Sequence, residues 1–343
     1  MRKLILFGIL LLLLALACNF PALASQPSSP SKVIAQLIIT PDPNATATPT
    51  PFMPIPITPT PTAPSQPTPA PEGMATPAEP VNLEPIDTPD GIVKILILGS
   101  DWRPASGFRT DVIILLTVNT RTGGASMVSF PRDLYVSIPG IGQQRINTAQ
   151  QFGGFPLTVQ TFQTNFGVTP NYYVMTNFQG FTSIIDSLGG IEVEADRNLT
   201  DTCKLSQAVN GYCSVGPGRV YMNGETALWY VRSRYSSSDF DRTRRAQEVI
   251  TGVFKKLMSL NAITKAPELY QQFRNNVETD IPLDIAIRLA AFAPGIISNP
   301  DKLQRFAIGP NEVWNYVTES GAQVLLPITD RIQLILYQAL NIQ

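Results

Sequence analysis

The sequence predicts an α/β or α+β fold, a sandwich of helices around a mixed β-sheet. Two nearly continuous apolar runs, Ile92–Leu98 and Val112–Val118, are typical of strands buried on both faces of a sheet. Further short apolar runs downstream alternate with segments in which apolar residues recur at helical spacing. This alternation indicates layers of helix packed on a sheet.

The expected strands are bounded by turn residues. Gly99 follows the first strand, and Gly123-Gly124 separates the second strand from the third. Alternating polar and apolar residues at 191–195 indicate a strand that is exposed on one face. The expected strands are 92–98, 112–118, 126–130, 134–138, 172–175, 191–195, 305–308 and 323–326.

The expected helices have recognisable ends. Pro156 suits the first turn of a helix over 157–166, because its missing N–H has no partner there. Asn223 can cap a helix over 225–231. A longer helix begins near Asp239 or Asp241 and runs to about Leu260. The other expected helices are 178–188, 268–274, 283–291 and 330–340.

Residues 1–24 predict export from the cytoplasm. Arg2 and Lys3 precede an uncharged apolar run, as in a signal peptide or membrane anchor. The segment allows lipoprotein cleavage before Cys18, ordinary cleavage after Ala24, or an uncut span that crosses the bilayer. All three outcomes place the bulk of the protein outside the cytoplasm, anchored to the membrane in two of them and released in the third.

Residues 25–90 form a linker rich in proline and threonine, which cannot build a core and favours extended polyproline II. It is a tether that holds a domain away from a membrane or a disordered spacer of no required length. The remaining residues, 91–343, make the folded domain.

Composition excludes several kinds of chemistry. The chain contains no histidine, which rules out Ser-His-Asp and Cys-His catalysis and HExxH zinc sites. The net charge of −1 gives no overall attraction to nucleic acid. Cys203 and Cys213 flank a polar loop, and in an oxidising compartment they are expected to form a disulfide, with two free thiols as the alternative.

Charged residues gather where the first strands end. Asp101, Arg109, Asp111 and Arg132 all follow or precede apolar runs, and strand ends are where an α/β sheet usually keeps its site. Carboxylates there can hold a hard divalent ion such as Mg²⁺, and arginines can bind phosphate oxygens with two hydrogen bonds.

The long helix adds more arginines. Its apolar stripe continues backward onto Arg242 and Arg245, so both lie on the inward face near the helix N-terminus. Asp239 is a candidate partner, and Arg232 and Arg234 come just upstream. A pyrophosphate held by arginines and Mg²⁺ fits this set, and structural salt bridges are the alternative for each pair.

These residues belong to a set of short motifs that follow one another over about 93–259. The motifs are Gly99-Ser100-Asp101, Arg109-Thr110-Asp111, Ser129-Phe130-Pro131-Arg132-Asp133, Arg145-Ile146-Asn147-Thr148-Ala149, Leu188-Gly189-Gly190-Ile191, Asn223-Gly224-Glu225-Thr226-Ala227-Leu228, Val231-Arg232-Ser233-Arg234 and Asp239-Phe240-Asp241-Arg242-Thr243-Arg244-Arg245. In the joint order of these motifs, each of which is weak alone, the chain resembles the LytR-CpsA-Psr (LCP) family of cell-envelope glycopolymer transferases.

The resemblance implies a three-layer α-β-α sandwich with a central mixed β-sheet. It implies an extracytoplasmic enzyme that moves a glycopolymer from a polyprenyl-pyrophosphate carrier to a cell-wall acceptor, usually a peptidoglycan sugar hydroxyl. By motif, Asp101 and Asp111 hold Mg²⁺ and one of them helps to deprotonate the acceptor. The residues implied at the pyrophosphate are Arg109, Arg132, Arg232, Arg234 and Arg245, with Arg242 and Asp239 beside them.

Two further expectations concern the surroundings of that site. The family commonly has glutamine where this chain has Ala246, and Gln247 points about 100° further round the helix. A candidate wall for the lipid, with ordinary core packing as the alternative, consists of Phe178, Phe181, Ile184, Ile185 and Leu188. A polyprenyl-pyrophosphate hydrolase and a non-catalytic regulator or scaffold that binds lipid phosphate are the competing functions.

Overall fold

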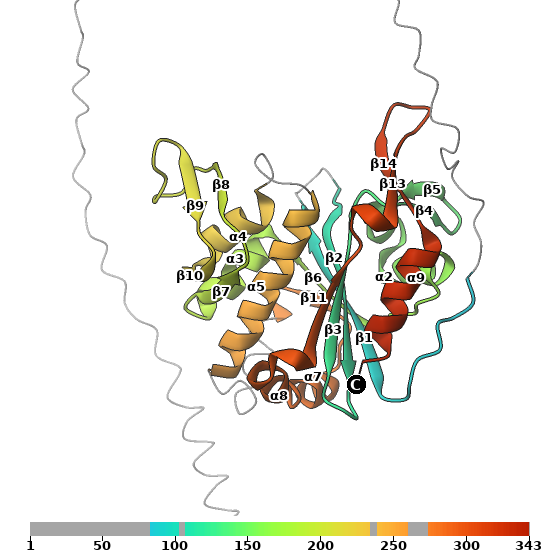
Figure 1. Ribbon diagram of the computed structural model, residues 1–343, viewed down its shortest axis with the longest axis horizontal. Helices are drawn as coiled ribbons and strands as arrows, with labels where there is room; N and C mark the ends of the chain where they lie inside the picture. The colour runs from blue at the N-terminus through green and yellow to red at the C-terminus, as the bar shows by residue number, and fades with distance from the viewer. Residues whose placement is uncertain (1–82, 103–106, 234–238, 260–273, 343) are drawn as a thin grey trace, which may run out of the picture. The chain divides into compact units, whose positions relative to one another are not determined.

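A mixed six-stranded sheet forms the centre of the computed structural model, which describes residues 83–102, 107–233, 239–259 and 274–342 (Figure 1). The strand order is β11-β6-β1-β2-β3-β12. Strand β1 is antiparallel to β2 and parallel to β6, and β3 is antiparallel to β2 and parallel to β12. The strands are β1 (Ile92–Ser100), β2 (Thr110–Asn119), β3 (Ala125–Phe130), β6 (Tyr172–Asn177), β11 (Glu278–Thr279) and β12 (Leu303–Ala307).

Helices cover both faces of this sheet, which confirms the predicted layers. One face packs against α2 (Ala149–Phe166) and α9 (Thr329–Leu340). The opposite face packs against α5 (Asp239–Ser259), α7 (Leu283–Ala290) and α8 (Ala293–Ser298). Figure 1 shows these two groups of helices on either side of the strands. Alternate residues of each strand point to opposite faces, so Leu96 and Ile95 join different cores.

A third core lies beyond α5. Helix α5 packs on β7 (Ile191–Ala195), which pairs with β10 (Gly218–Met222). Helices α3 (Phe178–Ser187) and α4 (Gly224–Arg232) complete this core. Asn177 and Asn223 cap α3 and α4 by accepting from the backbone N–H of Gly180 and Thr226. The cap at Asn223 is the one that the sequence predicted.

Hairpins and short 3-10 helices account for the remaining regular elements of the described residues. The two cysteines predicted to pair form a disulfide between Cys203, which follows β8, and Cys213 of β9, so it links the two strands of the β8–β9 hairpin. The elements are β4 (Tyr135–Ile138), β5 (Gly142–Arg145), β8 (Leu199–Thr202), β9 (Tyr212–Val215), β13 (Val313–Val317), β14 (Gln323–Pro327), η1 (Ile146–Thr148), η2 (Pro300–Lys302) and η3 (Pro310–Glu312).

Some expected boundaries differ from the structure. Segments 134–138, 191–195 and 323–326 contain strands that pair in two-stranded sheets outside the central one. Helix α2 begins at Ala149, earlier than expected, and has non-helical backbone at Gly153 and Gly154 before Pro156. Gly154 has φ 62°, which glycine adopts without steric penalty.

Parts of the expected organisation lie outside the described residues. These are the leader at 1–24, the linker up to residue 82, and the helix at 268–274 except for its last residue. In the described part of the chain, no helix combines the length and hydropathy that a membrane span needs.

Candidate functional site

A β-bulge positions the first carboxylate. Gly99 pairs with Val112 and Ser100 pairs with Thr110, so Asp111 is the extra residue on its strand. Neighbouring residues of a regular strand point to opposite faces, but here Asp111 and Val112 both line the same cavity. The bulge therefore turns the Asp111 carboxylate toward the cavity.

Asp101 lies next to this bulge. It directly follows Ser100, the residue paired with Thr110, and its own N–H donates to the Arg109 carbonyl at 3.0 Å. Its carboxylate Oδ1 accepts the Arg109 backbone N–H at 2.6 Å, and Oδ2 lies 3.7 Å from the Arg109 guanidinium. The side chain of Arg109 is 56% exposed, so its guanidinium is free to reach a ligand.

Arg132 links the strand ends to the long helix. Its Nη1 donates to Asp111 Oδ1 at 2.8 Å, and its Nε lies 3.4 Å from Asp133 and 3.9 Å from Asp239. Burial acts to lower the pKa of Arg132, but the hydrogen bond with Asp111 and the three carboxylate charges outweigh it and raise that pKa. Arg132 therefore stays charged at the centre of the cluster.

Arg242 approaches the same group from α5. Its Nη2 donates to the Asp111 carbonyl at 3.1 Å and lies 2.8 Å from Asp239 Oδ1. Burial lowers the pKa of Arg242 and raises the pKa of Asp239, in each case against the attraction of the partner charge. The first turn of α5 thus holds an ion pair between a buried arginine and a partly buried aspartate, and this pair faces the strand ends.

The other predicted arginines differ in position. Arg232 is exposed at the end of α4, with its guanidinium carbon 4.3 Å from the centroid of the Phe178 ring. Arg245 is 1% exposed, donates to the Ser233 carbonyl and lies over the ring of Tyr230. It is not among the described residues that line the cavity. Arg234 lies outside the described residues.

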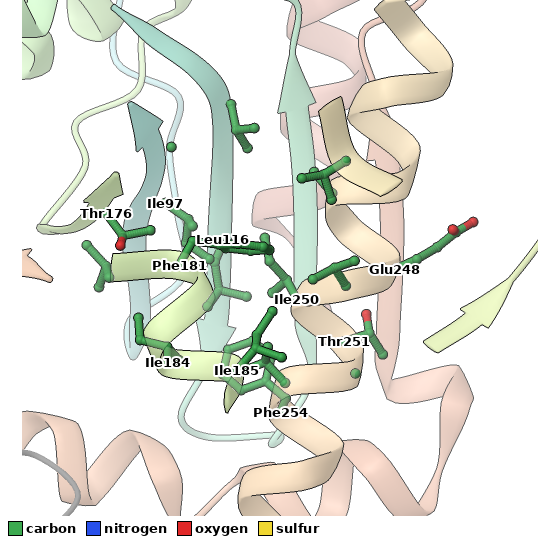
Figure 2. Close-up of a pocket in the computed structure, with 18 of the residues that line it drawn as sticks. Ile97, Leu116, Thr176, Phe181, Ile184, Ile185, Glu248, Ile250, Thr251 and Phe254 are labelled. Atoms are coloured by element: carbon green, nitrogen blue, oxygen red, sulfur yellow. The ribbon is translucent and has the colours of Figure 1, made fainter. Parts of the chain in front are cut away.

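A cavity of about 1490 Å³ connects these charges with an apolar interior. Asp101, Asp111, Arg109, Arg132, Arg232 and Arg242 line its charged end, and the remaining lining is mainly apolar but also includes Glu192, Glu194, Asp201, Glu225, Glu248, Lys255 and Arg305. The interior lies between the sheet and helices α3, α5, α7 and α8. Figure 2 shows side chains of α3 and α5 around this space, with Ile97 and Leu116 of the sheet between them.

Four of the five residues predicted as a lipid wall line this cavity, namely Phe178, Phe181, Ile184 and Ile185. Leu188 does not, because it is 4% exposed and packs in the core around β7 and β10. The apolar residues of the sheet, α5, α7 and α8 that line the same space were not singled out from the sequence. Their only signal is an apolar pattern that also describes ordinary core.

Ala246 and Gln247 have different surroundings. Ala246 lines the cavity, whereas Gln247 is 4% exposed and donates to Ser129 Oγ at 2.6 Å and to the Phe306 carbonyl at 2.7 Å. The Gln247 amide therefore holds α5 to strands β3 and β12.

The two carboxylates have the chemistry that Mg²⁺ requires. Each of Asp101 and Asp111 accepts through Oδ1, and neither Oδ2 accepts a hydrogen bond from another described residue. The described residues contain no group of three or more acidic, cysteine or histidine side chains that could hold a metal. Mg²⁺ commonly binds through one or two carboxylates and completes its shell with water and phosphate oxygens, so this pair fits it.

Relatives with solved structures share this fold. A crystal structure of Bacillus subtilis TagV superposes with a TM-score of 0.61 at 24% identity, covering 74% of this chain and 99% of that one. A structure described as TagT bound to LIIa-WTA has a TM-score of 0.56 at 27% identity, covering 73% of this chain and 90% of that one.

A curated relative is the polyisoprenyl-teichoic acid–peptidoglycan teichoic acid transferase TagU of Bacillus subtilis (strain 168). It is 36% identical over 193 residues, which are 55% of this chain and 60% of the relative. The alignment thus covers less than two thirds of that relative's length. The sequence profile of the LytR_cpsA_psr family matches residues 69–335. The chain therefore belongs to the LytR_cpsA_psr family.

Proposed function

We propose that the protein transfers a glycopolymer from a polyprenyl-pyrophosphate carrier to a hydroxyl of a cell-wall acceptor, such as a peptidoglycan sugar. The observation that carries the proposal is one cavity with arginines and aspartates at one end and apolar side chains in its interior. A polyprenyl pyrophosphate has the same two parts, an anionic head and an apolar tail. The names of relatives, among them a transferase for polyisoprenyl-teichoic acid and peptidoglycan, support the same class of substrate.

The arginines suit the anionic head. Arg132 is held by three carboxylates, and Arg242 is held by the Asp239 carboxylate and the Asp111 backbone carbonyl, so their guanidinium groups are oriented before a ligand arrives. Arg109 and Arg232 are more exposed and can close on the pyrophosphate from the outside. Preorganised cations of this kind stabilise the charge that develops on transferring phosphate oxygens. In this proposal Arg245 acts indirectly, by holding the end of α4 through the Ser233 carbonyl, and the role of Arg234 rests on its motif alone.

The proposed reaction is a substitution at phosphorus. The acceptor hydroxyl oxygen forms a bond to the phosphorus that carries the glycan, and the bond from that phosphorus to the bridging oxygen breaks. Polyprenyl phosphate leaves with the bridging oxygen, and the hydroxyl proton passes to Asp101 or Asp111. Both carboxylates line the cavity at its charged end, where they can accept that proton.

Asp101 and Asp111 are also the residues proposed to hold Mg²⁺. When bound there, the ion would offset the negative charge of the pyrophosphate.

The location of the enzyme follows from its substrate. A polyprenyl carrier resides in the membrane, so we propose that the N-terminal segment keeps the domain at the outer side of the cytoplasmic membrane. The proline-rich linker would then let the domain reach both the carrier and the wall.

The function is tested with the purified full chain, a polyprenyl-pyrophosphate-linked glycan, Mg²⁺ and a peptidoglycan acceptor. We expect glycan on the acceptor and free polyprenyl phosphate in equal amounts. Arg132→Ala should lower the rate by 100-fold or more, because it removes a cation held at the reacting phosphate. Arg121→Ala is the matched control, since Arg121 pairs with Asp90 on the exposed surface and does not line the cavity.

The alternatives give different results. Free glycan phosphate as the sole product, with acceptor present, would indicate a hydrolase. Tight binding without turnover, unchanged by Arg132→Ala, would indicate a lipid-phosphate-binding scaffold. EDTA should stop transfer and added Mg²⁺ should restore it, and full activity in EDTA would contradict the proposed metal.

A further inference from the structure

Helices α7 and α8 form a wall of the cavity with an unusual exposure pattern. Residues of α7 that line the cavity include Leu283, Ile287 and Leu289. No residue of α7 is fully buried, although its apolar residues lie on one side of the helix. An amphipathic helix normally buries its apolar face against other side chains. Here part of that face borders open cavity, which leaves it available to an apolar ligand.

This wall lies at the end of the cavity opposite Asp101 and Asp111. Along β2 the lining runs from Asp111 at the charged end to Val118. The seven residue-to-residue steps from Asp111 to Val118 span about 24 Å at 3.4 Å per step. At the Val118 end, Val118 and Leu303 both pair with Ala125, and Phe292, which lies between α7 and α8, is beside the turn at Gly123. The junction of α7 and α8 therefore lies at the deep end.

The deep wall carries three small residues that face the cavity, Ala286, Ala290 and Ala293. Ala286 and Ala290 are four residues apart and share a face of α7. Each alanine leaves space that a larger apolar side chain would fill. The size of the side chains at these three positions therefore determines how far the cavity extends at this end.

The size of the cavity suits a long tail. If a methylene group needs about 30 Å³, the liquid share of a water molecule, a five-carbon isoprene unit needs about 150 Å³. The cavity of about 1490 Å³ includes the charged end as well as the apolar interior, so it has room for at most about ten such units.

We propose that the α7–α8 wall sets the length of the polyprenyl tail that the protein accepts, with Ala286, Ala290 and Ala293 as the specificity-determining residues. This inference rests on the proposed function, because it assigns the interior of the cavity to the carrier's tail. A tail that fits buries all its apolar surface, whereas a larger residue at the deep end excludes the last units. Replacing one alanine by phenylalanine then shortens the longest tail that binds in full.

The test offers the full-length protein an equimolar mixture of C15, C35 and C55 polyprenyl phosphates in detergent micelles, and mass spectrometry measures the bound lipids. The wild type should retain mostly C55. Ala290→Phe should lower the bound C55:C15 ratio by tenfold or more while C15 binding stays within twofold. Ala291→Phe is the matched control, because Ala291 is exposed and does not line the cavity.

Ala290→Leu is a second, smaller change that covers the case in which the phenylalanine variant does not fold. It should shift the ratio in the same direction by a smaller factor. An unchanged C55:C15 ratio in both folded variants, or an equal loss of both lipids, would overturn the proposal. Failure of the wild type to bind any of the three lipids would contradict the proposed function itself. The proposal that the α7–α8 wall sets the tail length would then fail with it.

Discussion

The two faces of the central sheet are built from alternate residues of the same strands, yet one face is filled and the other is hollow. On the filled face, Phe130, Phe162 and Phe166 are each 1% exposed or less, and their ring centroids lie 5.0–5.4 Å apart. On the hollow face, Ile97, Val112 and Phe254 are partly buried and border the cavity. The comparison separates the part of the fold that supports the site from the part that receives a ligand.

The filled face keeps the strand ends in place. Phe130 belongs to this core and directly precedes the segment that carries Arg132 and Asp133. The hollow face begins at the same strand ends, where the bulge turns Asp111 toward the cavity. A rigid core behind an open face is what a site needs if its charges must be oriented before binding.

The largest expected effect is on the filled face. Phe162→Ala removes a buried ring from the three-ring cluster and should lower the free energy of unfolding by about 3–5 kcal/mol. Urea unfolding of the purified domain measures it. A loss below about 1 kcal/mol would mean that this face is also loosely packed.

A smaller loss is expected where α5 is fixed to the sheet. Gln247→Ala leaves the Phe306 carbonyl and Ser129 Oγ without their amide donor. The expected loss of stability is about 2 kcal/mol, because buried polar groups are left unsatisfied. Gln179→Ala, on an exposed position of α3, is the matched control and should be close to neutral.

A still smaller loss of stability is expected at the hollow face itself. Phe254→Ala removes a ring that already borders open space, so it should destabilise the unliganded protein by less than about 1.5 kcal/mol. The same variant should weaken binding of a long-chain polyprenyl phosphate by about tenfold, because apolar contact with the tail is lost. Equal destabilisation by Phe254→Ala and Phe162→Ala would show that the two faces of the sheet are equally well packed, which would contradict the difference proposed between them.

The smallest effect concerns pH and Asp239. Burial raises the pKa of Asp239 in the folded protein. Above that pKa the carboxylate is ionised in both the folded and the unfolded chain, and its burial lowers the free energy of unfolding. Below the pKa of Asp239 in the unfolded chain the group is protonated in both states, so this loss of stability is absent. Asp239→Asn should therefore gain stability relative to the wild type as pH rises from 4 to 7.5. Urea unfolding at both pH values measures the difference, and a relative loss at pH 7.5 would show that the ion pair with Arg242 outweighs burial.

Much of the framework was predictable from the sequence because it depends on local patterns. The continuous apolar runs predicted β1 and β2, and the side-chain cap at Asn223 predicted the start of α4. The apolar stripe of the long helix correctly placed Arg242 and Arg245 on its inward face, where both are buried.

What was not predictable depends on pairing and on empty space. The bulge at Asp111 depends on the register between β1 and β2, which the apolar pattern does not specify to one residue. Periodicity put Arg242 and Arg245 on one face but could not tell that one lines the cavity and the other contacts Ser233. An apolar residue beside a cavity, such as Phe254, has the same sequence pattern as one in a filled core.

A structure of the protein with a long-chain polyprenyl phosphate and Mg²⁺ tests the central claim most directly. We expect the tail between the sheet and helices α3, α5 and α7, with the phosphate within hydrogen-bond distance of Arg132 and Arg242. A tail on the face covered by α2 and α9, or a phosphate bound away from Arg132, would contradict it.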